Sequence, residues 1–162
     1  MCSRIKHISI LVIIVLALFL LFSASRPDRW ILTQYSDATG NQSMFYSLVN
    51  ERDKTLILID GGWTENAANV ETVINENGGQ VAAWFMTHYH EDHCGAFNAL
   101  WPKYRDNIDV VYTTPLIWED FIEVAQYWDT PETFSTFLEQ TGGQEILYSF
   151  TGMMSLRYTD WM

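Results

Sequence analysis

Three of the four histidines of this 162-residue chain, His88, His90 and His93, fall within six residues, together with Asp92. Imidazole and carboxylate groups are good ligands for zinc and also for iron or manganese. Alternate residues of an extended segment point to the same side, so His88 and His90 can hold one ion together. A turn directly after them would direct Asp92 and His93 toward a second ion, and two ions about 3.5–4 Å apart can hold a hydroxide and polarise the bond that it attacks. We therefore interpret this stretch as a metal site with one or two ions and not as a solvated loop with chance histidines.

The segments around these histidines have the patterns of buried strands and of helices. The apolar runs Thr55–Ile59 and Val81–Met86 predict two buried strands, and the second of them ends just before the histidines. The first ends in Asp60-Gly61-Gly62, after which apolar residues at helical spacing predict a helix from Thr64 to Asn77. A short helix is expected over Ala96–Leu100, closed before Pro102.

The other elements predict a layered α/β domain. Further strands are expected at Ser43–Val49, Ile108–Thr113 and Glu145–Phe150, and helices at Ile117–Trp128 and from Thr130 to Gly142. The chain shows no internal repeat and no linker, so we expect one domain over residues 30–150. Six aromatic residues in the later helices are expected to form mostly core or cleft wall, and one or two of them could form a substrate platform: Trp118, Phe121, Tyr127, Trp128, Phe134 and Phe137.

The pattern His88-x-His90-x-Asp92-His93 resembles the signature motif of the metallo-β-lactamase superfamily. The strand that ends in Asp60-Gly61 is similar to the Asp-Gly turn of that family, and the order of elements agrees as far as Phe150. Together with Asp60-Gly61-Gly62 and Gly95, the same pattern resembles exported hydrolases related to the metallo-hydrolase domain of DNA-uptake competence proteins. The resemblance implies the N-terminal portion of an αββα sandwich, and a hydrolase that activates water on one or two zinc ions to cleave an ester, amide or phosphodiester bond.

The resemblance also implies a role for each residue of the motif. His88 and His90 would bind the first metal ion, and Asp92 and His93 the second. Asp92 would also orient the attacking water or act as its base, so it is the candidate catalytic residue. Asp60 would support the ligands from behind, as the need for fixed ligand orientation suggests, although an ordinary Asp-Gly turn is an equal alternative. Cys94 is expected to be a small packed thiol, and Tyr89 and Glu91 exposed loop residues.

Ligands that the family takes from later in its chain have no counterpart here. A complete site uses two further histidines and a bridging Asp, but no histidine follows His93, and the only other one is His7. We therefore expect an incomplete domain with weak metal binding and an uncovered apolar sheet face, whose missing C-terminal half could be a partner. The unpatterned tail at residues 151–162 suggests a truncation. The alternatives to an active hydrolase are a catalytically incompetent fragment and a surface metal-binding module.

The N-terminal residues 1–25 resemble a signal peptide or a membrane anchor. Arg4 and Lys6 precede an apolar run from Ile8 to Phe22, which is interrupted only by Ser9, and small residues follow at positions 23–25. The run is near the length that a bilayer requires, so both cleavage and membrane insertion through residues 5–24 stay open. We expect a protein that is anchored facing the cell exterior, or one that is secreted.

The charge balance argues against a nucleic-acid partner. The chain carries a net charge of -11, and the part from residue 26 onward has seven basic and twenty acidic residues, a net charge of -13. Such a surface repels phosphate backbones, although bound metal ions would change the local sign.

Overall fold

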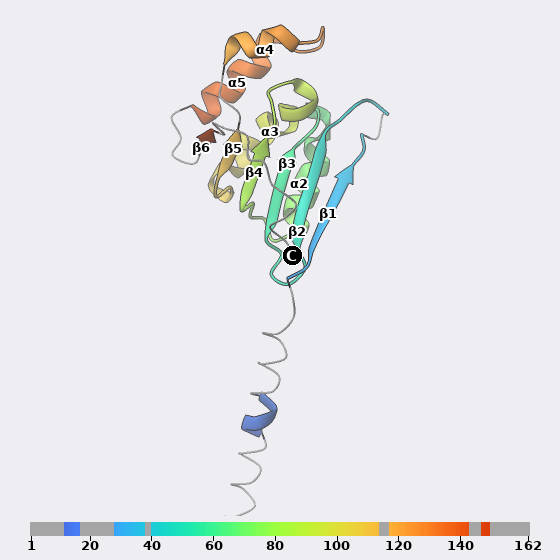
Figure 1. The fold of residues 1–162 in the computed structure, drawn as a ribbon, viewed down its shortest axis with the longest axis vertical. Helices are drawn as coiled ribbons and strands as arrows, with labels where there is room; N and C mark the ends of the chain where they lie inside the picture. Colours follow the sequence, from blue (N-terminus) through green and yellow to red (C-terminus); the bar gives the residue numbers. More distant parts are fainter. Residues whose placement is uncertain (1–11, 17–27, 38–39, 114–116, 143–146, 150–162) are drawn as a thin grey trace, which may run out of the picture.

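The computed structural model describes residues 12–16, 28–37, 40–113, 117–142 and 147–149. Within these residues the chain forms one six-stranded mixed sheet with helices (Figure 1). Of the expected N-terminal segment, only 12–16 are described, and they are helical and exposed. No helix in the described ranges is long and apolar enough to cross a membrane. The tail at 151–162 lies outside the described residues.

The strands lie in the sheet in the order of the sequence. The first three pair antiparallel and the last three continue in parallel from the third. Parallel neighbours require crossover connections, and a helical connection precedes each of the last three strands. The strands are β1 (Trp30–Tyr35), β2 (Phe45–Asn50), β3 (Leu56–Asp60), β4 (Ala83–Met86), β5 (Val111–Thr113) and β6 (Leu147–Ser149).

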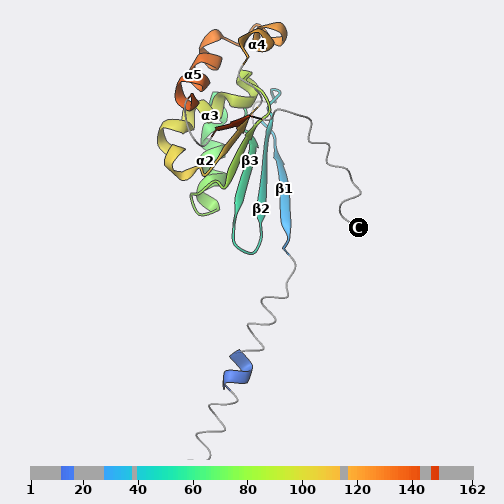
Figure 2. The same cartoon turned by 60° about the vertical axis from the view of Figure 1, so that its left-hand side comes forward.

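Apart from the helical residues 12–16, the described helices gather on one side of the sheet, as Figure 2 shows. They are α2 (Ala67–Glu76), α3 (Glu91–Tyr104), α4 (Trp118–Val124) and α5 (Pro131–Thr141), with short 3₁₀ turns at Thr64–Asn66 and Arg105–Asn107. The core lies between the sheet and α3. Trp84 of β4 meets the edge of Phe97 at 5.0 Å between ring centroids, and Phe97 also contacts Phe137 of α5 at 5.1 Å. All three side chains are buried.

Strand β3 shows why the two faces of the sheet differ. Leu56 and Leu58 are almost completely buried, whereas the alternating residues Ile57 and Ile59 are only partly buried. Alternate residues of a strand point to opposite faces of the sheet. Because residues 56–59 are all apolar, β3 presents apolar side chains to both faces before it ends at Asp60. The same register continues across the sheet, and partly buried apolar side chains line the face without described helices: Tyr46, Leu48, Ile57, Ile59, Phe85 and Tyr112.

The structure corrects several expected boundaries. The helix expected at 96–100 is α3, which begins at Glu91 and continues through Pro102 to Tyr104. Proline has no N–H for the carbonyl of Asn98, four residues before it, but the side-chain amide of Gln140 donates to that carbonyl at 3.2 Å. The helix expected at 117–128 is shorter, ending at Val124. Strand β1 was not expected.

Candidate metal centre

Asp60 is the residue on which the site is built. It ends β3 with a positive φ of 53°, and its side chain is buried. One carboxylate oxygen accepts the backbone N–H of Thr87 at 2.9 Å, and the other accepts the Thr87 hydroxyl at 2.8 Å. Nδ1 of His93 lies 2.8 Å from the second oxygen. Asp60 therefore ties the end of β3 to the loop after β4 and to the first turn of α3, which an ordinary Asp-Gly turn would not do.

Backbone hydrogen bonds hold the loop after Asp60 against the start of α3. The N–H of Gly61 donates to the carbonyl of His93 at 2.7 Å, and the N–H of Ala96 donates to the carbonyl of Gly62 at 3.1 Å. The fit is tight, because a Cβ atom on Gly95 would lie 2.5 Å from the backbone nitrogen of Thr64. The glycines on both segments thus allow the two backbones to approach.

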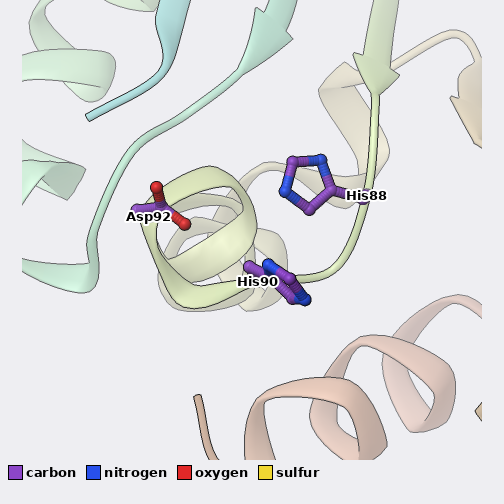
Figure 3. A group of neighbouring side chains, drawn as sticks. All are labelled: His88, His90 and Asp92. Atoms are coloured by element: carbon purple, nitrogen blue, oxygen red, sulfur yellow. The ribbon is translucent and has the colours of Figure 1, made fainter. Parts of the chain in front are cut away.

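His88, His90 and Asp92 form a cluster with metal-ligating chemistry (Figure 3). Each of the three offers one ligand atom, and these atoms all lie within 4.8 Å of one another. His88 and His90 come from the extended loop after β4, and Asp92 comes from the first turn of α3. Ligand atoms around a tetrahedral zinc ion are about 3.4 Å apart, so small side-chain rotations would close this set on an ion. The residues present fit a metal ion with three protein ligands.

His93 occupies a different position from the other two histidines. Its Nδ1 faces Asp60, and its Nε2 lies 3.7 Å from an oxygen of Asp92. The Asp60 contact fixes the ring orientation and leaves Nε2 as the ring nitrogen that faces the cluster, the arrangement that metal-binding histidines commonly show. The role of His93 as a ligand of a second ion stays a prediction.

Burial sets the protonation of the cluster in the metal-free protein. Desolvation lowers the pKa of His88 to about 4, and the neighbouring His93 and His90 act in the same direction. Desolvation raises the pKa of Asp92, against the opposite influence of His93. His88 is therefore neutral at neutral pH, the form in which imidazole binds a metal ion.

Asp129 is a buried carboxylate at the site that the motif did not identify. Its side chain is fully buried, and Oδ2 lies 3.8 Å from Nδ1 of His90. Its oxygens accept the backbone N–H groups of Glu91 at 2.9 Å and of Gln126 at 2.8 Å. The residue lies in the loop between α4 and α5, so only the folded chain brings it to His90. The helix start expected at Thr130 marks this loop, but nothing in the sequence separates Asp129 from the other acids there.

The sequence predicts that Tyr89 and Glu91 are exposed loop residues, and the structure shows that this prediction is wrong. The Tyr89 ring is buried against Phe134 and Phe137, because alternation in the extended loop turns it away from the histidines and into the core. The carboxylate of Glu91 accepts the hydroxyls of Thr64 at 2.6 Å and Thr133 at 2.8 Å. Both residues therefore position the loop that carries the ligands.

Cys94 is buried, and desolvation raises its pKa well above the ordinary value. A buried thiol with a raised pKa is a poor metal ligand, which agrees with its expected role as a small packed side chain.

The cluster opens into a cleft of about 390 Å³. The four motif residues form its floor, and the chain around α4 and the loop before β2 form its walls. The lining residues are Gln42, His88, His90, Asp92, His93, Val124, Gln126 and Trp128. This volume lies within the range that is typical of small-molecule pockets.

The model of the metallo-beta-lactamase superfamily matches residues 40–152, and the chain belongs to this family. The matched range contains β2, β3 and the whole histidine motif. Membership defines the fold and the kind of site, and the His88, His90 and Asp92 cluster corresponds to the family's His-x-His-x-Asp pattern.

Three of the solved structures with similar folds illustrate the range of proteins that the chain resembles. A Thermotoga maritima protein described as a metallo-beta-lactamase is 16% identical, with a TM-score of 0.46, and the match covers 79% of this chain and 62% of that one. A metallo-beta-lactamase from Pseudomonas aeruginosa in its mono-zinc form is 18% identical, with a TM-score of 0.34 and coverage of 56% and 43%. The chemotaxis sensor ODP, solved as a peroxy diiron species, is 21% identical, with a TM-score of 0.38 and coverage of 57% and 41%. No curated protein sequence matches the chain.

The chain spans about half the length of these structures, from 41% to 62%. The specific group of competence-related hydrolases that the motif resembles is not resolved by the family match.

Proposed function

We propose that the chain contributes the first metal-binding half of a hydrolase that cleaves an ester, amide or phosphodiester bond with metal-activated water. The observation that carries the proposal is the cluster of His88, His90 and Asp92 at the start of α3, in a chain of the metallo-β-lactamase superfamily. Zinc is the first candidate ion, with iron or manganese as alternatives, because imidazole and carboxylate ligands suit all three.

His88 and His90 would hold the first ion, and Asp92 with His93 would hold a second. When bound, the ion lowers the pKa of a water molecule to about 7 and polarises the bond that this water attacks. Asp92 faces the cluster from the first turn of α3, so its carboxylate can hold the attacking water and accept its proton. Asp60 holds His93 and Thr87 in place, which keeps the ring orientation fixed while the charge at the site changes.

The remaining metal ligands would come from a second α/β half that covers the face of the sheet without described helices. The apolar side chains of β2 and β3 on that face support such a partner, because an apolar sheet face is normally packed against a second layer of structure: Tyr46, Leu48, Ile57 and Ile59. The finer likeness to competence-related hydrolases rests on the motif and the Asp60-Gly61-Gly62 turn. The acidic charge favours a substrate other than nucleic acid.

The proposal is tested by metal binding and by hydrolysis, measured separately on the full chain. Zinc content after dialysis and calorimetric affinity should both fall at least tenfold in the variant with His88→Ala and His90→Ala. Asp109→Asn is the matched control, since Asp109 lies outside the cleft of the cluster. 4-Nitrophenyl acetate and bis(4-nitrophenyl) phosphate report esterase and phosphodiesterase activity with added zinc, manganese or iron. Equal zinc retention in the variant and the control would remove the proposed metal site.

A surface metal-binding module is the second candidate function. It is favoured by the size of the ligand set, because two imidazoles and one carboxylate bind an ion without completing a family site. Zinc retention without hydrolysis of either substrate would support this function and contradict catalysis by the chain alone. A secreted or membrane-anchored location also stays a proposal, supported by the apolar run after Arg4 and Lys6.

A further inference from the structure

A second cleft, of about 470 Å³, adjoins the metal cleft. Its walls come from the loop before β2, the 3₁₀ turn after β3 and the loop between α4 and α5. The two clefts share the side chains of Gln42 and Trp128. The lining residues are Asp37, Asn41, Gln42, Trp63, Glu65, Tyr127 and Trp128. A molecule that occupied both clefts would therefore extend from these aromatic rings to the histidine cluster.

Three aromatic rings of this cleft meet edge to face. The centroids of Trp63 and Trp128 are 6.1 Å apart with an interplanar angle of 66°, and those of Tyr127 and Trp128 are 4.6 Å apart at 74°. Tyr127 is 94% exposed and Trp128 37% exposed, so part of each residue is accessible to a ligand. The indole N–H of Trp63 donates to the carbonyl of Gln42, which fixes this ring on the wall. In an edge-to-face pair the edge of one ring lies against a face of its partner, so each pair leaves ring faces that the partner ring does not cover.

The polar groups of the cleft are acidic or neutral. Asp37 and Glu65 bring two carboxylates, and the lining as described includes no Lys or Arg. Asp37 is held in place, since its oxygens accept the side-chain amide of Asn66 at 2.9 Å and the backbone N–H of Asn41 at 3.2 Å. A cation in this cleft would be attracted both by the charge of the carboxylates and by the quadrupole of the aromatic rings. An anionic group would be repelled by both.

We propose that this cleft, defined by Trp63, Tyr127, Trp128, Asp37 and Glu65, binds the alkylammonium group of a small organic cation. The substrate class that follows is an ester or amide with a quaternary or protonated amine, whose cleavable bond lies over His88, His90 and Asp92. This second step rests on the proposed hydrolase function, but the binding of the cation does not. An alkylammonium group fits because it is weakly hydrated and can face several rings at once.

The binding test uses an isosteric pair of esters and the metal-free full chain. Acetylcholine carries a trimethylammonium group, and 3,3-dimethylbutyl acetate carries an uncharged group of the same shape. Tryptophan fluorescence or calorimetry should give at least about tenfold tighter binding of acetylcholine. Equal binding of the two esters, or binding of neither, would overturn the proposal. Methyl β-D-glucoside is the third probe, and tighter binding of this neutral sugar than of acetylcholine would overturn it as well.

Variants locate the cation in the cleft. Glu65→Gln and Trp128→Leu should each weaken acetylcholine binding by about three- to tenfold, and Glu65→Gln should leave the neutral ester unchanged. Glu76→Gln is the matched control, because Glu76 is an exposed acid at the end of α2 and outside the cleft. A loss in the control equal to that in Glu65→Gln would show a general charge effect and contradict the site. Hydrolysis of acetylcholine with added zinc is a separate assay, so a failure of catalysis with intact binding is distinguishable from a failure of the cation site.

Discussion

At the scale of single residues, the site pairs histidines with carboxylates, and the described lining of its cleft includes no Lys or Arg. Three imidazoles and three carboxylates meet within the first turn of α3 and the loops around it, and the carboxylates come from three different segments: Asp60, Asp92 and Asp129. Each histidine other than His88 faces a carboxylate through a ring nitrogen. His88 instead lies 3.1 Å from the Thr87 hydroxyl through Nδ1. His88 is thus the imidazole with the least support for a positive charge.

The low pKa of His88 predicts a dependence of stability on pH in the metal-free protein. The folded pKa of about 4 lies below the ordinary value of 6.5, so the unfolded chain binds the proton more readily. The protonation of His88 therefore does not affect the free energy of unfolding above pH 6.5, and it lowers this free energy as the pH decreases from 6.5 toward 4. After allowance for solvent screening of this partly exposed ring, we expect a loss of about 1–2 kcal/mol.

Urea unfolding of the chelator-treated protein at pH 6.5 and 4.5 measures this loss. His88→Gln removes the titrating group, so the variant should lose about 1–2 kcal/mol less than the wild type over the same range. The comparison also cancels Asp92, whose raised pKa gives the opposite pH dependence in both proteins. Identical losses in the two proteins would contradict the low pKa of His88.

Asp129 is expected to position His90 for metal binding. Its carboxylate holds two backbone N–H groups and lies 3.8 Å from Nδ1 of His90, so it favours the tautomer that keeps the proton on that nitrogen. Asp129→Asn keeps an oxygen for the N–H of Glu91 but removes the charge and the acceptor of the Gln126 N–H. We expect zinc affinity to fall by about tenfold, together with a loss of about 1 kcal/mol of stability from the lost hydrogen bond.

Calorimetric zinc titration and thermal unfolding distinguish positioning from general support. Glu119→Gln, a change of an exposed acid on α4, is the control and should leave the affinity unchanged. A fall in melting temperature together with an unchanged zinc affinity would indicate that Asp129 supports only the fold.

At the scale of elements, the strands around the motif were predictable because their apolar runs are short and end in clear signals. The Asp60-Gly61-Gly62 turn and the polar motif mark the carboxyl ends of β3 and β4, and parallel neighbours bring those ends together. The length of α3 was not predictable, because Pro102 reads as a helix end and the contact that compensates for it comes from Gln140 on α5. β1 was missed because its apolar residues Trp30–Leu32 stand alone before polar ones.

The tight approach of the Gly62 loop to its neighbours predicts a large cost for a side chain there. Gly62 has a φ of +79°, and a Cβ atom would lie 2.4 Å from Oγ of Ser43 and 2.6 Å from Oδ1 of Asn66. Gly79 has the same φ of +79°, but a Cβ atom there would meet nothing within 4 Å. Gly79→Ala should therefore cost about 1 kcal/mol for the backbone alone.

Gly62→Ala should cost about 1–2 kcal/mol more than Gly79→Ala, because the Asn66 side chain must leave its bonds to the N–H of Trp63 and to Ser43. Chemical unfolding of both variants measures the difference. Equal destabilisation would show that the side chains around Gly62 move freely.

At the scale of the whole molecule, helices cover one side of the sheet, and the other side is apolar and carries no helix among the described residues. On the helix-covered side, Trp84, Leu58 and Phe97 form a buried core. On the other side, Phe85 and Tyr112 stack at 4.8 Å between centroids and continue the row of Ile57 and Ile59. The candidate ligands lie at the end of the same sheet, so a domain that covered this apolar face would also reach the metal cleft.

Because this apolar face carries no helix among the described residues, we expect the chain to associate with itself when no other domain covers the face. Ile57→Lys places a charge on the part of this face that β3 forms, without removing a side chain from the core on the other side, so it should reduce self-association while the circular dichroism spectrum stays unchanged. Sedimentation velocity of the full chain measures the change, and the N-terminal apolar segment is the same in both proteins. Leu58→Ala is the contrasting variant from the next position of the same strand, because Leu58 is fully buried and its truncation should cost about 2–5 kcal/mol of stability. If Ile57→Lys unfolded the protein as Leu58→Ala does, the face would already be covered within the chain, and the need for a second half would be removed.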